Sequence, residues 1–408
     1  MGFFEPSPSK LLVVNDIPQC GVCALYKRCV TPKMPVWGYG RKGVLMVGEM
    51  PSVEADADGL PIVGSGLDLV QSVLEEFGYG LVSDCWYTNS IICNSAVQDE
   101  PTLSQVGYCR PNIMGLIQEL EPRVIVLFGK SAVDAVLGPY WKEGGGLGSI
   151  NRWAGWQIPM QEWNAWVVPM WHPDYVMNHV QNSKWFQDAP ALKLWFKRYL
   201  RTALSAQGRP WDVVPDYVSR VQSMYDPQDA ASWVRRKIAS REGVSTFDYE
   251  TNCLKPDSDK AAIVSASICW DGETIAFPWV GAAVGAMAEY TMSDCPKIGA
   301  NAKFEDRWTL AKLGHRVSNW VWDVVLDAHI LNNCPGITSV KFQALVRLGY
   351  PDWSVSIGSF LKGGSGNELN TIHLVELSKL LLYNGLDSLC QYEIALKQRA
   401  EYRGGFLF

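Results

Sequence analysis

Phe247-Asp248-Tyr249-Glu250-Thr251 places two carboxylates two residues apart in a stretch of strand-forming residues. Side chains at this spacing point to the same side of a sheet, so Asp248 and Glu250 face one point. Apolar or alternating runs surround the stretch, separated by turn residues: Gly243–Phe247, Ala261–Cys269 and Thr274–Trp279. This pattern predicts an antiparallel meander that carries both carboxylates on its first strand.

The sequence after the meander predicts helices packed on this sheet. Helical patterns cover Val280–Tyr290, Phe304–Leu313 and Val324–Leu331, with strand candidates at Lys297–Asn301 and Val317–Asp323. Two helices are expected in 374–402. The fold class is therefore α/β for this half of the chain.

Two further acidic motifs follow in order, Asn301-Ala302-Lys303-Phe304-Glu305-Asp306 and Tyr383-Asn384-Gly385-Leu386-Asp387. In-line attack of water on a phosphodiester uses two divalent cations, and hard cations such as Mg²⁺ or Mn²⁺ take oxygen ligands. The tyrosine of the third motif lies one helical turn before the aspartate, on the same face, where it can hold the attacking water. The motifs predict a two-metal nuclease site. Its predicted ligands are Asp248, Glu250, Asp387 and either Glu305 or Asp306.

These motifs resemble the proofreading 3′–5′ exonuclease domain of family A DNA polymerases, in the DnaQ-like DEDD superfamily, tyrosine subtype. The resemblance implies a ribonuclease H-like α/β domain with a mixed sheet. The middle motif departs from the family, which usually has Asp one residue after the aromatic, because Glu305 stands there and Asp306 follows. The implied catalytic residues are Asp248, Glu250, Glu305, Tyr383 and Asp387.

Four cysteines in the first half of the chain form a possible metal-ligand set. Cys20-Gly21-Val22-Cys23 is followed by Cys93 and Cys109. Eleven cysteines without a signal peptide argue against a disulfide framework and for a reducing cytoplasm. Thiolates gathered from separate segments suit either an iron–sulfur cluster or a structural zinc.

The segments around these cysteines resemble the iron–sulfur uracil-DNA glycosylases, family 4 and relatives, across about residues 15 to 200. They are Gly48-Glu49-Met50-Pro51-Ser52, Pro61-Ile62-Val63-Gly64, Tyr87-Thr88-Asn89 and Trp171-His172-Pro173-Asp174. The resemblance implies an α/β/α sandwich that binds DNA and carries a 4Fe–4S cluster on the four cysteines. It implies a uracil pocket formed by Glu49, Ile62, Asn89 and His172.

The departures from that family fall in the pocket. Ile62 stands where the family has a Phe that stacks on the flipped uracil, a contact worth about 1–3 kcal/mol per base. Met50 and Ser52 replace Ala and Gly in the loop, which would narrow a site built for close backbone approach. We therefore expect a DNA-binding domain with weak or no glycosylase activity.

Composition limits how the chain can contact DNA. It has 36 Lys and Arg against 42 Asp and Glu, a net charge of −6. A protein that depends on bulk positive charge would not have this balance, so DNA contact is expected from local basic clusters. No apolar run reaches the ~20 residues of a membrane helix.

Together the motifs predict two domains, 1–205 and 216–408, joined by a linker at 206–215. We expect a cytoplasmic 3′–5′ DNA exonuclease fused behind a glycosylase-like iron–sulfur domain. No polymerase domain follows the third motif before Phe408, so a separate DNA polymerase is the expected partner. Such a compact fusion is typical of a bacteriophage replication module, which would place it in the bacterial host cytoplasm. The alternatives are a bifunctional glycosylase and exonuclease, or a non-enzymatic DNA-binding scaffold.

Overall fold

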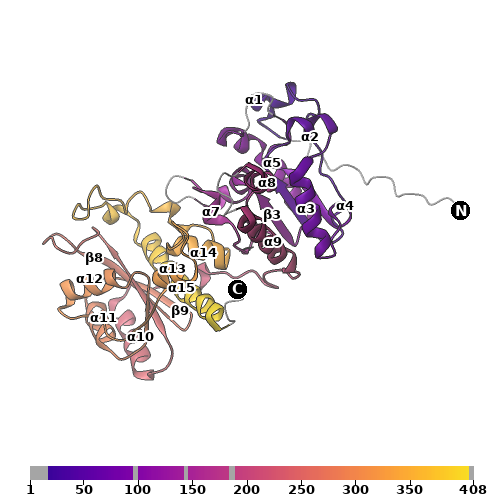
Figure 1. The fold of residues 1–408 in the computed structure, drawn as a ribbon. Coiled ribbons are helices and arrows are strands. Elements are labelled where there is room, and N and C mark those ends of the chain that lie inside the picture. Colours follow the sequence, from indigo (N-terminus) through magenta and orange to yellow (C-terminus); the bar gives the residue numbers. More distant parts are fainter. Residues whose placement is uncertain (1–16, 95–99, 142–145, 183–188, 404–408) are drawn as a thin grey trace. The chain divides into compact units, whose positions relative to one another are not determined.

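The computed structural model describes residues 17–94, 100–141, 146–182 and 189–403. The chain divides into two compact units, Met1–Val214 and Pro215–Phe408. Figure 1 shows the first in indigo to magenta and the second in pink to yellow. Two α/β units are what the sequence predicts. None of the helices in the described ranges is both long enough and apolar enough to span a membrane.

The first unit is a five-stranded sheet between helices. Its order is β2-β1-β3-β5-β4, with β4 antiparallel to β5 and the other neighbours parallel. The strands are β1 (Val44–Gly48), β2 (Cys85–Asn89), β3 (Val124–Phe128), β4 (Ile158–Met160) and β5 (Ala165–Met170). The helices are α1 (Cys20–Cys23), α2 (Val53–Asp58), α3 (Gly64–Glu76), α4 (Leu81–Asp84), α5 (Leu103–Leu120), α6 (Lys130–Leu137), α7 (Ile150–Trp153), α8 (Pro173–Asn182) and α9 (Ala189–Ser205).

Both faces of this sheet are buried, which explains why β1 and β3 are continuous apolar runs. Alternate residues such as Met46 and Phe128 pack with α3, α8 and α9 on one face. Helices α5 and α6 pack together, and α6 contacts β1 and β3. The predicted α/β/α sandwich is confirmed.

The second unit has a six-stranded mixed sheet of order β11-β10-β7-β8-β9-β6. The central strands β7, β8 and β9 form the predicted antiparallel meander, and the outer neighbours pair in parallel. The strands are β6 (Val221–Ser223), β7 (Ser245–Thr251), β8 (Ile263–Trp270), β9 (Glu273–Pro278), β10 (Lys297–Gly299) and β11 (Trp320–Asp323). The helices are α10 (Pro227–Ser240), α11 (Ala282–Met292), α12 (Lys303–Leu313), α13 (Val324–Leu331), α14 (Val340–Leu348) and α15 (Leu377–Arg403).

Helix α15 corrects one prediction, because two helices were expected in 374–402 and one continuous helix spans most of this stretch. Gly385 lies inside this helix and allows close packing there: a Cβ at this position would lie 2.2 Å from Val221 Cγ1. The glycine therefore lets α15 approach strand β6 without ending the helix.

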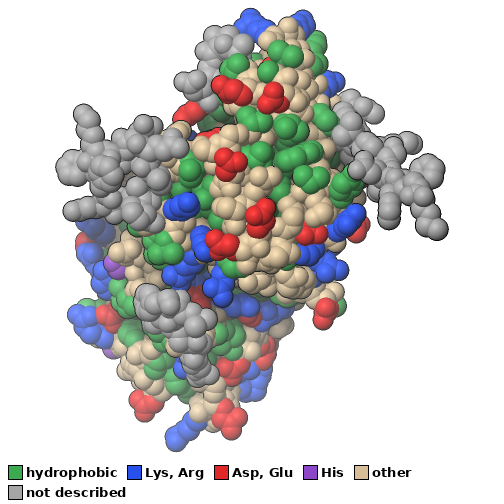
Figure 2. Space-filling view, turned by 45° about the vertical axis from the view of Figure 1, so that its right-hand side comes forward, with side chains coloured by type: hydrophobic (Ala, Val, Ile, Leu, Met, Phe, Trp, Pro, Cys, Tyr) green, Lys and Arg blue, Asp and Glu red, His purple; other side chains and the backbone are tan. Residues whose placement is uncertain are grey.

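The segment expected to link the two domains, 206–215, is partly attached to the first unit. The Arg209 guanidinium donates to the carbonyl oxygens of Pro122 and Glu121, each at 2.9 Å. Asn164 Oδ1 accepts from the Trp211 amide at 3.1 Å. On the molecular face drawn in Figure 2, acidic and basic side chains are interspersed with apolar ones, in keeping with the small net charge.

Candidate active site and cysteine cavity

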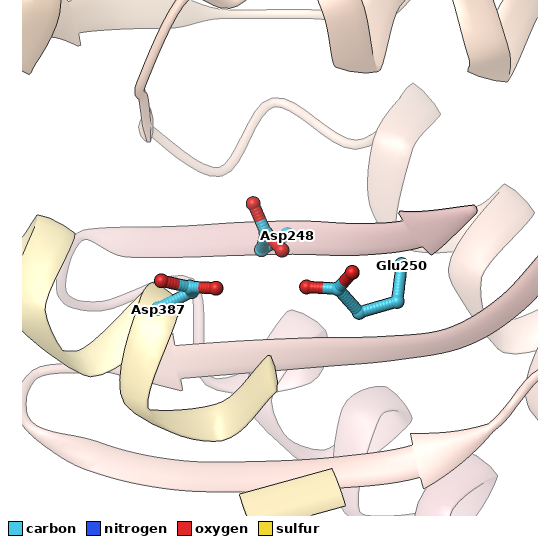
Figure 3. A group of neighbouring side chains, drawn as sticks. All are labelled: Asp248, Glu250 and Asp387. Carbon is cyan, nitrogen blue, oxygen red and sulfur yellow. The ribbon is translucent and has the colours of Figure 1, made fainter. Parts of the chain in front are cut away.

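Three acids of the second unit meet at one point between β7 and α15. Asp248, Glu250 and Asp387 each offer a carboxylate oxygen, and these oxygens all lie within 4.8 Å of one another. Figure 3 shows the two β7 side chains and the α15 side chain with their carboxylates turned toward a common centre. Oxygen ligands this close suit a divalent cation of the Mg²⁺ or Mn²⁺ type.

The alternation of β7 places the acids on the face covered by α15. Phe247 and Tyr249 point the other way and pack in the core with α10 and α11. Opposite Asp248 and Glu250, strand β8 presents small serines at the paired positions. These serines bind Asn384 of α15: Ser267 Oγ donates to its carbonyl oxygen at 2.8 Å, and its Nδ2 donates to Ser265 Oγ at 2.8 Å. This network fixes the helix close to the sheet.

Burial and mutual repulsion raise the pKa values of these acids. Burial, followed by the nearby Asp387 charge, raises the pKa of Asp248 to about 8. The pKa of Glu250 is raised well above its usual value, first by burial and then by Asp248. Carboxylates in such surroundings hold protons until a cation replaces them, so this cluster is built to bind positive charge.

The geometry distinguishes Glu305 from Asp306 at the start of α12. Glu305 is 3% exposed, and burial, followed by the Asp248 charge, raises its pKa. Its Oε2 is buried and has no partner in the described ranges. Asp306 instead accepts hydrogen bonds from the Arg316 guanidinium and, at 3.0 Å, from the Val317 amide. Asp306 therefore holds the segment that follows α12 against the first turn of this helix.

Tyr383 lies one turn before Asp387 on α15, as the motif requires, and both are bound by a lysine that sequence reasoning missed. Lys341 Nζ donates to Tyr383 Oη at 2.9 Å and to Asp387 Oδ1 at 2.5 Å. Burial would lower the pKa of Lys341, but Asp387 and Tyr383 raise it well above its usual value. No sequence motif marked this lysine, which lies in the first turn of α14 and outside the three acidic motifs.

In the first unit, the four predicted cysteine ligands converge. Cys20 and Cys23 on α1, Cys93 after β2 and Cys109 on α5 line one cavity. Burial raises the pKa of Cys93 to about 12 and of Cys109 to about 11. Neither would be a thiolate at neutral pH without a positive centre beside it.

The spacing of these sulfurs tests which group they suit. A zinc ion with Zn–S bonds of about 2.3 Å would bring its sulfurs to about 3.8 Å from one another. In the described residues, no three of the four cysteine sulfurs lie within 4.8 Å of one another. No disulfide joins the described cysteines either. The sulfurs are therefore not gathered as a bound zinc would hold them, and their shared cavity makes the four cysteines candidate ligands of a metal group.

The predicted uracil-pocket residues lie at the carboxyl ends of parallel strands. Glu49 directly follows β1, Asn89 ends β2 opposite Gly48, and His172 follows β5. Asn89 Nδ2 donates to the Pro61 carbonyl at 2.8 Å, which brings the buried Ile62 segment to the same edge. Glu49 Oε1 accepts from the Ser131 amide at 3.0 Å, and His172 Nδ1 accepts from the Asp174 amide at 3.3 Å. This edge is where ligands bind in open α/β sheets.

Comparison with known proteins agrees with this architecture. Residues 37–195 match the uracil DNA glycosylase superfamily. The type-4 uracil-DNA glycosylase of Archaeoglobus fulgidus is 26% identical over 171 residues, which cover 41% of this chain and 83% of that protein. The Sulfurisphaera tokodaii enzyme is 25% identical over 210 residues, covering 49% and 92%. The first unit contains a uracil-DNA glycosylase superfamily domain.

Solved structures similar to the chain include nucleases. The catalytic core of RRP6 from Trypanosoma brucei has a TM-score of 0.34 and 14% identity, covering 45% of this chain and 48% of that one. Brucella melitensis NrnC with bound Mg²⁺ has a TM-score of 0.32 and 13% identity, covering 46% and 82%.

Proposed function

We propose that this protein is a metal-dependent 3′–5′ DNA exonuclease whose glycosylase superfamily domain binds DNA. The observation that carries the proposal is the meeting of Asp248, Glu250 and Asp387 within 4.8 Å. Glu305 is proposed as the fourth acid, because Asp306 is engaged elsewhere. Two Mg²⁺ or Mn²⁺ ions held by these acids would stabilise the attacking and leaving oxygens of an in-line displacement.

In this proposal Tyr383 holds the water that attacks the terminal phosphodiester. Its hydroxyl receives a hydrogen bond from Lys341, so its own proton is left to point at a water. Lys341 also donates to Asp387, which holds the side chains of Tyr383 and Asp387 next to each other on one face of the helix. The substrate is proposed to be a DNA 3′ end, and a separate polymerase the partner, in keeping with the proofreading resemblance.

The proposed cofactor of the first domain is a 4Fe–4S cluster on Cys20, Cys23, Cys93 and Cys109. The cavity that all four cysteines line supports it. Such a cluster would connect α1 with α5. Its reduced cysteine ligands fit a cytoplasmic location, which would be the bacterial host cytoplasm if the protein is encoded by a phage. The proposed domain limits are 1–205 and 216–408.

The exonuclease is tested with a 5′-labelled single-stranded oligonucleotide and Mg²⁺. The wild-type chain should produce a ladder that disappears in EDTA and in Asp248→Asn. If Asp248→Asn digests DNA as the wild type does, the metal assignment is wrong. If the wild type digests neither single- nor double-stranded DNA, the non-enzymatic scaffold becomes the better account.

A second activity, uracil excision, is favoured by Glu49, Asn89 and His172 at one sheet edge. One feature opposes it: Ile62 offers no aromatic ring. We propose weak or no excision. Release of uracil from a dU oligonucleotide in EDTA, lost in Asn89→Ala or His172→Ala, would establish the bifunctional alternative.

A further inference from the structure

Gln391 is a buried amide beside the acidic site whose hydrogen bonding is only half satisfied. It lies on α15 one turn after Asp387 and is 2% exposed. Its Nε2 donates to Asp248 Oδ1 at 3.2 Å. Its Oε1 is buried and accepts no hydrogen bond from any described residue.

A second glutamine on the same helix shows what full pairing looks like. Gln398 lies two turns further along α15 and is completely buried. Its Nε2 donates to the Val324 carbonyl at 2.9 Å, and its Oε1 accepts from Trp322 Nε1 at 3.1 Å. The unpaired oxygen of Gln391 is therefore a property of its position next to the acids.

The unpaired Gln391 oxygen has a counterpart in Glu305. Glu305 Oε2 is also buried without a partner in the described part of the chain. Two unpaired buried oxygens thus belong to the proposed fourth acid on α12 and to the α15 amide that binds Asp248. Leaving such oxygens unpaired is costly, so both call for a donor that arrives with a ligand. The Glu305 carboxylate can coordinate a metal ion directly. The neutral amide oxygen of Gln391 is better suited to accept a hydrogen bond from a water bound to that ion.

We propose that Gln391 is a positioning residue for the metal-bound site, an inference that rests on the proposed two-metal function. An ionised carboxylate can only accept hydrogen bonds. The Gln391 Nε2 donates to one oxygen of Asp248 and leaves the other oxygen for the cation. Its Oε1 accepts a hydrogen bond from a water carried by that cation. Partners of this kind orient metal ligands, and their loss typically weakens metal affinity or activity by about 10–100-fold.

The test compares Gln391→Leu with the matched control Gln398→Leu in the full chain. Mn²⁺ affinity is measured without DNA by electron paramagnetic resonance of free Mn²⁺, and digestion is followed as a function of Mn²⁺ and of oligonucleotide. Gln391→Leu should weaken Mn²⁺ binding by about 10–100-fold and raise the Mn²⁺ needed for half-maximal rate equally, leaving KM for DNA unchanged. Gln398→Leu should lower the melting temperature yet bind Mn²⁺ as the wild type does.

The outcomes separate this inference from the function on which it rests. Wild-type Mn²⁺ affinity in Gln391→Leu, together with lost binding in Asp248→Asn, overturns the role of Gln391 alone. Unchanged Mn²⁺ binding in both variants overturns the metal site and the inference with it. Should the leucine variant fail to fold, Gln391→Met fills the position with a flexible chain and gives the same readout.

Discussion

The acidic site predicts that, without metal, the second unit loses stability as the pH rises. Asp248 in the folded state keeps its proton up to a pKa of about 8, whereas the unfolded carboxyl releases it near 3.8. Between these values folding takes up a proton, so the stabilisation is complete below about pH 4 and is lost as the pH rises through about 8. Replacing Asp248 by Asn removes this titration.

The magnitude follows from the proton difference. Raising the pH from 5 to 7 crosses two pH units of this window and costs about 3 kcal/mol of unfolding free energy. This is an upper value, because the Asp248 side chain keeps some solvent contact. For a unit of this size, that corresponds to about 6–12 °C in melting temperature.

The assay is thermal unfolding of the full chain in EDTA at pH 5, 6 and 7, for wild type and Asp248→Asn. The transition of the second unit is identified by its upward shift with Mn²⁺. The melting temperature of wild type minus that of Asp248→Asn should fall across this range. With saturating Mn²⁺ the trend should reverse, because the metal requires the deprotonated acid. A difference that stays constant or rises with pH in EDTA would refute the reasoning.

Three further predictions concern side chains near the two sites. Glu305→Gln should lose most of the metal-dependent digestion. Asp306→Asn should keep this activity but have a lower melting temperature than the wild type. Equal digestion rates in the two variants would contradict Glu305 as the metal ligand. Lys341→Met should destabilise the metal-free chain by about 3–5 kcal/mol, because it leaves a buried carboxylate without its partner, and Mn²⁺ should restore part of this loss in thermal unfolding. Cys109→Ser should lose the visible absorbance and iron content of the anaerobically purified chain, whereas Cys85→Ser, at a buried cysteine outside the cavity, should keep both; retained iron in Cys109→Ser would remove it from the ligand set.

Much of the fold was readable from local patterns. The period of two in Phe247–Thr251 gives the strand and the shared face of Asp248 and Glu250, and Gly314 ends α12 in the left-handed conformation that favours glycine. The division of 374–402 into two helices was wrong, because the continuous α15 is held by packing such as the close approach of Gly385 to Val221, which is far away in sequence.

The candidate site was only partly predictable for the same reason. Glu305 and Asp306 are adjacent in sequence, and the choice between them depends on Arg316 and Val317 capturing one carboxylate. Lys341 belongs to none of the three motifs, and it reaches the site because α14 packs against α15. Long-range packing of this kind leaves no periodic signal in a single sequence.

The direction and metal dependence of DNA digestion test the central claim most directly. One oligonucleotide is labelled at its 5′ end and, separately, at its 3′ end, and is incubated with the full chain in Mg²⁺ or EDTA. We predict a shortening ladder from the 5′ label and immediate release of a labelled mononucleotide from the 3′ label, in Mg²⁺ alone. Internal fragments, release from the 5′ end first, or digestion that persists in EDTA would contradict a two-metal 3′–5′ exonuclease.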